Sequence, residues 1–203
     1  MICSGYNPKR STKELSAEEI SRIVPIDFIP AKLSFEQIQQ TTADFPFHLP
    51  LEFYQLYQEG NGCLPIELGE KDWLSFDNYF PFPDLDRPFY PLREAMEIYQ
   101  DLERGRQDRD INHRQKYHIY PRLFPISGFE RRVRAVCGHE KQQESSPVFT
   151  FYSDSFGEPQ IEWSSLTNMM LAWVEVKERG LRSYEKAERE EMKAIWEKYG
   201  GRW

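Results

Sequence analysis

A chain of 203 residues with a formal net charge of −7 is unlike a nucleic-acid-binding protein, because such proteins gain most of their affinity from Lys and Arg side chains that neutralise phosphates. No run reaches the roughly 18 apolar residues that a membrane-spanning helix needs, and the first residues lack the apolar segment of an export signal, which predicts a cytoplasmic protein. A hydrophobic fraction of 39%, including 15% aromatic residues, predicts one domain with a core rich in Phe, Tyr and Trp.

The N-terminal part of the chain predicts an arm followed by two short helices. Residues 1–15 are polar and aperiodic, so we expect a flexible arm. Ser16 with Glu19, and Ser34 with Gln37, have the spacing of a capping box, in which each side chain accepts a hydrogen bond from the other residue's backbone N–H. Each pair predicts the start of a helix.

The segment LPLEFYQLYQEGNG, residues 49–62, predicts a core-facing helix that ends in a turn. Pro50 suits the first helical turn, and the following apolar residues repeat on one face at the spacing i, i+3, i+4. Gly60, Asn61 and Gly62 tolerate a positive φ better than other residues. We expect these three residues to form a structural turn, in which a left-handed cap ends the helix and the chain reverses into a sheet.

The middle of the chain predicts an extended connection, a helix and an insertion. Residues 67–90 contain three prolines, which forbid a long helix. From Leu92 the apolar residues recur at helical spacing until Gly105. The charged, aperiodic residues 106–116 are expected to form an exposed insertion.

After Tyr117 the sequence predicts a β-meander. The segments YHIYPRLFPIS, RRVRAVC and PVFTFY are short and rich in β-branched and aromatic residues, and the short strand QIEW follows them. In RRVRAVC, alternation places Val133, Ala135 and Cys137 on a buried face, and Arg132 and Arg134 on an exposed face.

Two helices are predicted at the C-terminal end. Ser164 or Ser165 caps the first helix, and Gly180 ends it. Residues 181–203 are helical by propensity and carry apolar residues along one side. We expect this last helix to pack on its own domain, and docking onto a second chain is the alternative.

The order of these elements predicts the fold class. Helices, then antiparallel strands, then helices indicate an α+β fold, because a parallel sheet needs alternating strands and helices. The prediction is a single domain over residues 16–180, with a mainly antiparallel twisted sheet packed against helices, plus a C-terminal helical extension over residues 181–203.

This order resembles the SUKH superfamily, which joins fungal regulators of cell-wall synthesis to bacterial toxin-immunity proteins. The resemblance covers about residues 34–178 and rests on LPLEFYQLYQEGNG, on LFPISGF, and on PVFTFY with IEWSSLTNMMLAWV. It implies a compact α+β scaffold that binds another protein and catalyses no reaction. We therefore expect an immunity-type or regulatory scaffold protein that masks its partner, such as a basic toxin domain.

The residues that often carry chemistry are scattered along the sequence. The four histidines and three cysteines lack metal-ligand spacings, so we expect no metal and no cofactor. The cysteines are expected to be reduced thiols, because they are an odd number and widely separated. The alternative function is a hydrolase that uses Cys137 beside His139, or acidic residues of the 67–90 segment.

Residues 67–90 are the predicted partner-binding segment. They hold six acids against two bases, interleaved with aromatic residues. Aromatic anchors suit an interface, and the acids would steer a basic protein towards it. The alternative for each aromatic ring is that it fills the core beneath a long connection. The residues expected to bind the partner are Glu70, Asp72, Trp73, Asp77, Asp84 and Asp86.

Overall fold

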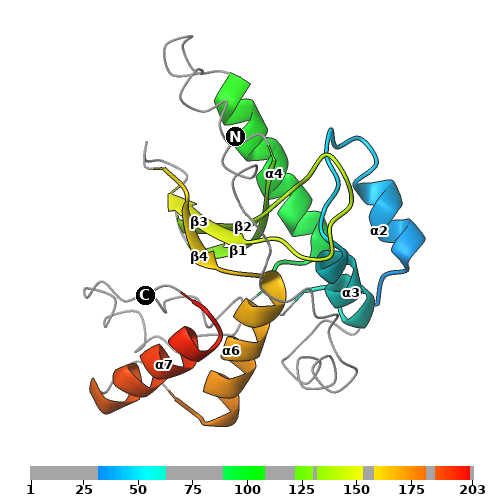
Figure 1. Cartoon of the computed structure of the whole chain (residues 1–203). Coiled ribbons are helices and arrows are strands. Elements are labelled where there is room, and N and C mark those ends of the chain that lie inside the picture. The colour runs from blue at the N-terminus through cyan, green and yellow to red at the C-terminus, as the bar shows by residue number, and fades with distance from the viewer. Residues whose placement is uncertain are drawn as a thin grey trace, which may run out of the picture.

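The computed structural model describes residues 32–62, 89–107, 122–129, 132–152, 158–181 and 186–201. These residues form five helices and four strands, and the sheet packs against helices in an α+β fold, as predicted (Figure 1). The predicted arm and the capping box at Ser16 lie outside the described residues. In chain order the elements are α2 Phe35–Thr41, α3 Leu51–Glu59, α4 Leu92–Gln107, β1 Leu123–Phe129, β2 Arg132–Cys137, β3 Val148–Tyr152, β4 Gln160–Trp163, α6 Leu166–Glu178 and α7 Lys186–Lys198.

The sheet is an antiparallel meander in which each strand pairs with the next along the chain, in the order β1, β2, β3, β4. The register of β1 on β2 shifts at a bulge between Pro125 and Ser127, and that of β3 on β4 shifts after Val148. The meander was predicted correctly because each strand carries the β-branched and aromatic residues that pack well on a pleated surface. None of the helices in the described ranges combines the length and apolar character that crossing a bilayer requires.

Side-chain caps begin two of the helices. At α2, Ser34 Oγ accepts from the Gln37 N–H at 3.2 Å and Gln37 Oε1 accepts from the Ser34 N–H at 2.7 Å, so the predicted capping box is confirmed. At α6 the cap is Ser165, whose hydroxyl accepts from the Asn168 N–H at 3.1 Å. These bonds satisfy N–H groups that the first helical turn leaves without a partner.

Glycine ends both C-terminal helices. Gly180 has a φ of +64°, and the N–H groups of Gly180 and Leu181 donate to the carbonyls of Lys177 and Val176, which forms a Schellman motif after α6. Gly200, with a φ of +75°, ends α7 in the same way. The prediction that Gly180 ends its helix is therefore confirmed.

The core is aromatic, as predicted, and α6 lies at its centre. Every residue of α6 from Met169 to Val176 is buried, which is expected only for a helix covered on all sides. α3, β4 and α7 contact it (Figure 1). Phe53 packs at right angles on Phe124 of β1, with ring centroids 5.4 Å apart, which joins α3 to the sheet.

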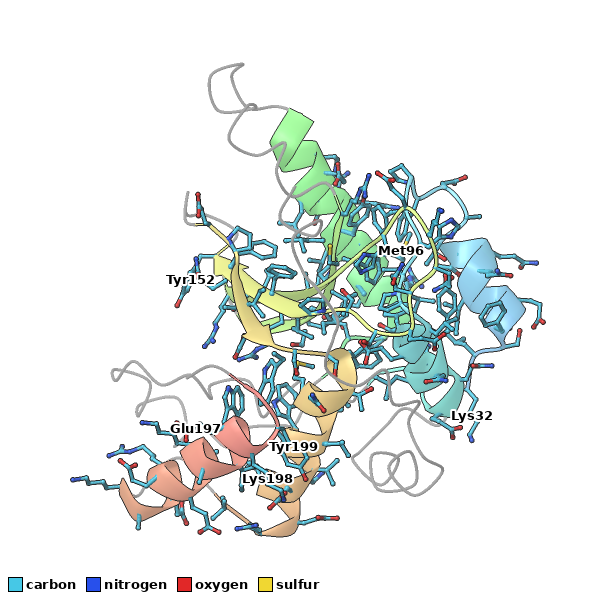
Figure 2. The ribbon with its side chains drawn as sticks, viewed as in Figure 1. Lys32, Met96, Tyr152, Glu197, Lys198 and Tyr199 are labelled. Atoms are coloured by element: carbon cyan, nitrogen blue, oxygen red, sulfur yellow. The ribbon has the colours of Figure 1, made fainter. Side chains whose placement is uncertain are left out.

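The C-terminal helix α7 packs on its own chain. Trp196 of α7 lies against Trp163 of β4, with ring centroids 4.0 Å apart, and both side chains are fully buried. Figure 2 labels Lys198 and Tyr199 at the end of α7. Both donate hydrogen bonds to Glu175 of α6. Apolar and charged contacts together hold α7 on α6.

Strand β2 differs from its prediction. The alternation of side chains is as expected, but Arg134 is 0% exposed, so the face that carries it is buried rather than open to solvent. Val136, on the same face, joins the main core, while Ala135 and Cys137 belong to a second small cluster on the opposite face. The predicted half-exposed strand is wrong, because both of its faces are covered.

Candidate functional site

The predicted partner-binding residues, Glu70 to Asp86, fall within residues 63–88, which lie outside the described residues. The structure does describe the two positions from which this segment leaves and to which it returns. The contacts at these two positions are therefore the part of the candidate site that the structure describes.

The Gly60–Asn61–Gly62 turn forms, but its geometry differs from the prediction. α3 ends at Glu59, and the Gly60 N–H donates to the Leu56 carbonyl at 3.1 Å. Gly60 itself is extended, with a φ of −169°, so the predicted left-handed cap is wrong at this residue. The left-handed residue is Gly62, with a φ of +81°. The predicted strand directly after the turn lies outside the described residues.

The turn packs against the start of α4, so the two ends of the 63–88 segment meet. Asn61 Oδ1 accepts from the Leu92 N–H at 3.0 Å, which gives α4 a cap from a distant part of the chain. A Cβ on Gly62 would lie only 2.3 Å from the backbone nitrogen of Pro91. The backbones of Gly62 and Pro91 therefore lie closer together than a residue with a Cβ atom at position 62 would allow.

The sheet supports both ends of the segment. The Tyr57 hydroxyl donates to the Tyr90 carbonyl at 2.8 Å, and the Tyr90 N–H donates to the Ile126 carbonyl of β1 at 2.7 Å. We call the group Tyr57, Asn61, Gly62, Tyr90 and Leu92 the loop base. It holds the entry and exit of the acidic segment on one edge of the sheet.

Two glycines with a positive φ provide a test of the loop base. Gly180→Ala should lower the free energy of unfolding by about 1 kcal/mol, since it adds backbone strain but its Cβ meets open space. Gly62→Ala should cost about 2 kcal/mol more, because its Cβ also collides with Pro91. Urea unfolding of both variants measures the difference. Equal losses would mean that the close approach at Gly62 contributes nothing.

The pair proposed for hydrolase chemistry, Cys137 and His139, is not arranged for catalysis. Cys137 is 0% exposed and its sulfur is in a disulfide bond, whose partner lies outside the described residues. The predicted reduced thiol is therefore wrong at this position, and a bonded sulfur supplies no thiolate. His139 uses its backbone to form an isolated antiparallel bridge with His48. Burial lowers the pKa of the half-buried His139 ring, and the positive charge of Arg122 lowers it further.

Glu52 of α3 is a buried carboxylate that joins three parts of the fold. Oε1 accepts from the N–H groups of Ser146 at 2.8 Å and Leu166 at 3.2 Å, and Oε2 accepts from the Thr167 N–H at 3.0 Å and hydroxyl at 2.8 Å. Burial raises the pKa of Glu52, while these four donors act in the opposite direction. The carboxylate lies at the N-terminus of α6, where the helix dipole favours negative charge.

The other buried charges are also paired inside the protein. Arg134 donates to both carboxylate oxygens of Glu162, at 2.8 and 3.0 Å. Burial would raise the pKa of Glu175, but hydrogen bonds from Lys198, Tyr199 and Arg179 lower it to about 2. Among the described residues, no three His, Cys, Asp or Glu side chains are grouped to hold a metal ion. These buried charges therefore have structural partners and hold the scaffold together.

Comparison of the sequence with protein-family models and with curated proteins finds no match. The assignment of a family and a function therefore depends on the sequence signals and the contacts described above.

Proposed function

We propose that this chain is a non-catalytic protein-binding module that presents residues 67–88, the part of the acidic segment before the buried Phe89 and Tyr90, to a basic partner protein. The observation that carries the proposal is the loop base, which joins both ends of the acidic segment to the rigid sheet edge. Binding residues are often found on a loop that a rigid scaffold positions. The resemblance to the SUKH superfamily supports the same class of function, an immunity-type or regulatory scaffold.

The composition of the segment supports a basic partner. Six acids and two bases give residues 67–90 more than half of the chain's net negative charge. Acids arranged around aromatic residues increase the association rate with a positively charged surface, while a desolvated aromatic side chain contributes most of the affinity. Trp73, which lies between acids in the sequence, is the expected anchor.

The hydrolase alternative gains no support from the described contacts. Cys137 is closed in a disulfide bond, and the buried carboxylates Glu52, Glu162 and Glu175 each accept hydrogen bonds from donors that hold helices or strands together. These contacts do not bear on the other version of that alternative, a hydrolase that uses acidic residues of the 67–90 segment.

The proposal is tested by purifying the tagged full chain from its native cells. We expect one protein to be recovered at close to equimolar yield. Trp73→Ala should reduce its affinity at least tenfold, as for an interface hot spot. Asp72→Asn with Asp77→Asn should slow association and weaken its dependence on salt.

Asp101→Asn is the matched control for the charge variants. Asp101 is an exposed acid on α4, outside the segment, in a surface ion pair with Arg104. Its neutralisation should leave the affinity unchanged. Recovery of no equimolar partner, or an affinity that is the same with Trp73→Ala as with the wild type, would contradict the proposal.

A further inference from the structure

His139 is the second residue of the connection between β2 and β3, residues 138–147. Its backbone N–H donates to the His48 carbonyl at 2.9 Å, and the His48 N–H donates back at 2.8 Å. The ring nitrogen Nε2 is enclosed and has no hydrogen-bond partner among the described residues. This nitrogen of the half-buried ring is therefore kept from water at the point where the connection joins the rest of the protein.

The 138–147 connection supplies the cap of helix α3. Pro50, at the N-cap position, makes no side-chain cap. Instead, the carbonyl of Gln143 accepts from the Leu51 N–H at 2.9 Å, and that of Glu144 accepts from the Glu52 N–H at 3.0 Å. Because these are donors that a helix start leaves unpaired, movement of the connection would expose the first turn of α3.

We propose that protonation of His139 in mildly acidic solution releases residues 138–147 from the start of α3, so that this contact is a pH-sensitive switch. A protonated imidazole carries an N–H on both ring nitrogens. An N–H at the enclosed Nε2 would have no acceptor and would add charge next to Arg122, which costs free energy that opening to water relieves. The switch goes beyond the proposed function and does not depend on it.

The titratable groups on the described segments next to His139 favour this response. Arg122, in the turn before β1, donates to Oε1 of Glu140 at 3.0 Å, and Nε2 of His139 has no hydrogen bond to this carboxylate. Lys141 adds a second positive charge in the connection, and His48 lies across the backbone bridge. None of these groups forms a hydrogen bond with Nε2 of His139.

The sign of the effect follows from linkage. The pKa of His139 is lower in the folded protein than its ordinary value, so its contribution to stability is complete above about pH 6.5 and is lost as the pH falls below that value. One proton changes an opening equilibrium by at most about tenfold per pH unit. Because the ring in the opened state gains its proton only below about pH 6.5, one pH unit above 5.5, the largest change in opening between pH 7.5 and 5.5 is about tenfold.

The test is amide hydrogen exchange of the full chain at pH 7.5 and 5.5, corrected for intrinsic rates. The protection of the Leu51 and Glu52 amides should fall by up to about tenfold at pH 5.5, while that of the Gly60 amide, at the other end of α3, should not change. His139→Gln should remove this pH dependence. His48→Gln, which keeps the backbone bridge, should behave as the wild type.

An NMR titration of the wild-type His139 ring keeps the proposal testable if the His139→Gln variant does not fold. Its midpoint should lie below 6.5, and the loss of protection should follow the same curve. A midpoint at or above 6.5, or unchanged protection of Leu51 and Glu52 while the ring titrates, would overturn the switch.

Discussion

Replacing Glu52 with alanine is expected to lower the free energy of unfolding by about 3 kcal/mol or more. The change leaves the N–H groups of Ser146, Leu166 and Thr167 without their acceptor, and each unsatisfied buried donor costs about 1–3 kcal/mol. It also removes a negative charge from the start of α6. Glu52→Gln keeps one accepting oxygen but turns an NH₂ group towards donors, so we expect an intermediate loss.

Glu59→Ala is the matched control, because Glu59 is the same residue type at the other end of the same helix. Its carboxylate forms only an exposed ion pair with Lys32, so a loss below about 0.5 kcal/mol is expected. Urea unfolding monitored by circular dichroism measures both variants. Similar losses at the two positions would show that Glu52 does not join α3, the 138–147 connection and α6 as described.

The parts of the fold that the sequence predicted correctly are those that depend on neighbouring residues. The capping box from Ser34 to Gln37 spans four residues, and the Schellman motif from Val176 to Leu181 spans six. The strands of the meander pair with their immediate successors. Because such contacts close short stretches of chain, the residue pattern contains the information needed to predict them.

Contacts between distant residues were not predicted. His48 and His139 are 91 positions apart and form a bridge, and Asn61 caps a helix that begins at Leu92. The Gly-Asn-Gly motif predicted a reversal. The glycine that takes the positive φ, Gly62, is the one that lies against the distant Pro91. Composition alone could not show that the acidic segment begins and ends at one place.

A signal for Glu52 was nevertheless present in the sequence. Residues 49, 53 and 56 form an apolar stripe, and Glu52 lies beside it on the face that packs on the core. A carboxylate at such a position must find donors inside the protein, since burying it without them is costly. Arg134 offers a weaker signal, because an alternating strand with one charged face is more often exposed on that face.

The second large effect on stability concerns the face of β2 that was predicted to be exposed and that carries a buried ion pair. Arg134 and Glu162 have side chains only 1% and 3% exposed, and two parallel hydrogen bonds join them. Arg132 also donates to Glu162, at 3.2 Å, and the Arg134 guanidinium carbon lies 5.7 Å from the centre of the Trp173 ring. The pair therefore links β2, β4 and α6.

Arg134→Met should lower the free energy of unfolding by about 3–5 kcal/mol, because it leaves the buried Glu162 without its main partner. Adding Glu162→Leu should restore most of that loss, since replacing both members of a buried ion pair with apolar residues is often close to neutral. Arg122→Met, which breaks the exposed pair with Glu140, should cost less than about 1 kcal/mol. Urea unfolding of the single and double variants measures the coupling. If the two losses at Arg134 and Glu162 simply add, the charges are not paired in solution, and β2 has the solvent-exposed face that its alternation first predicted.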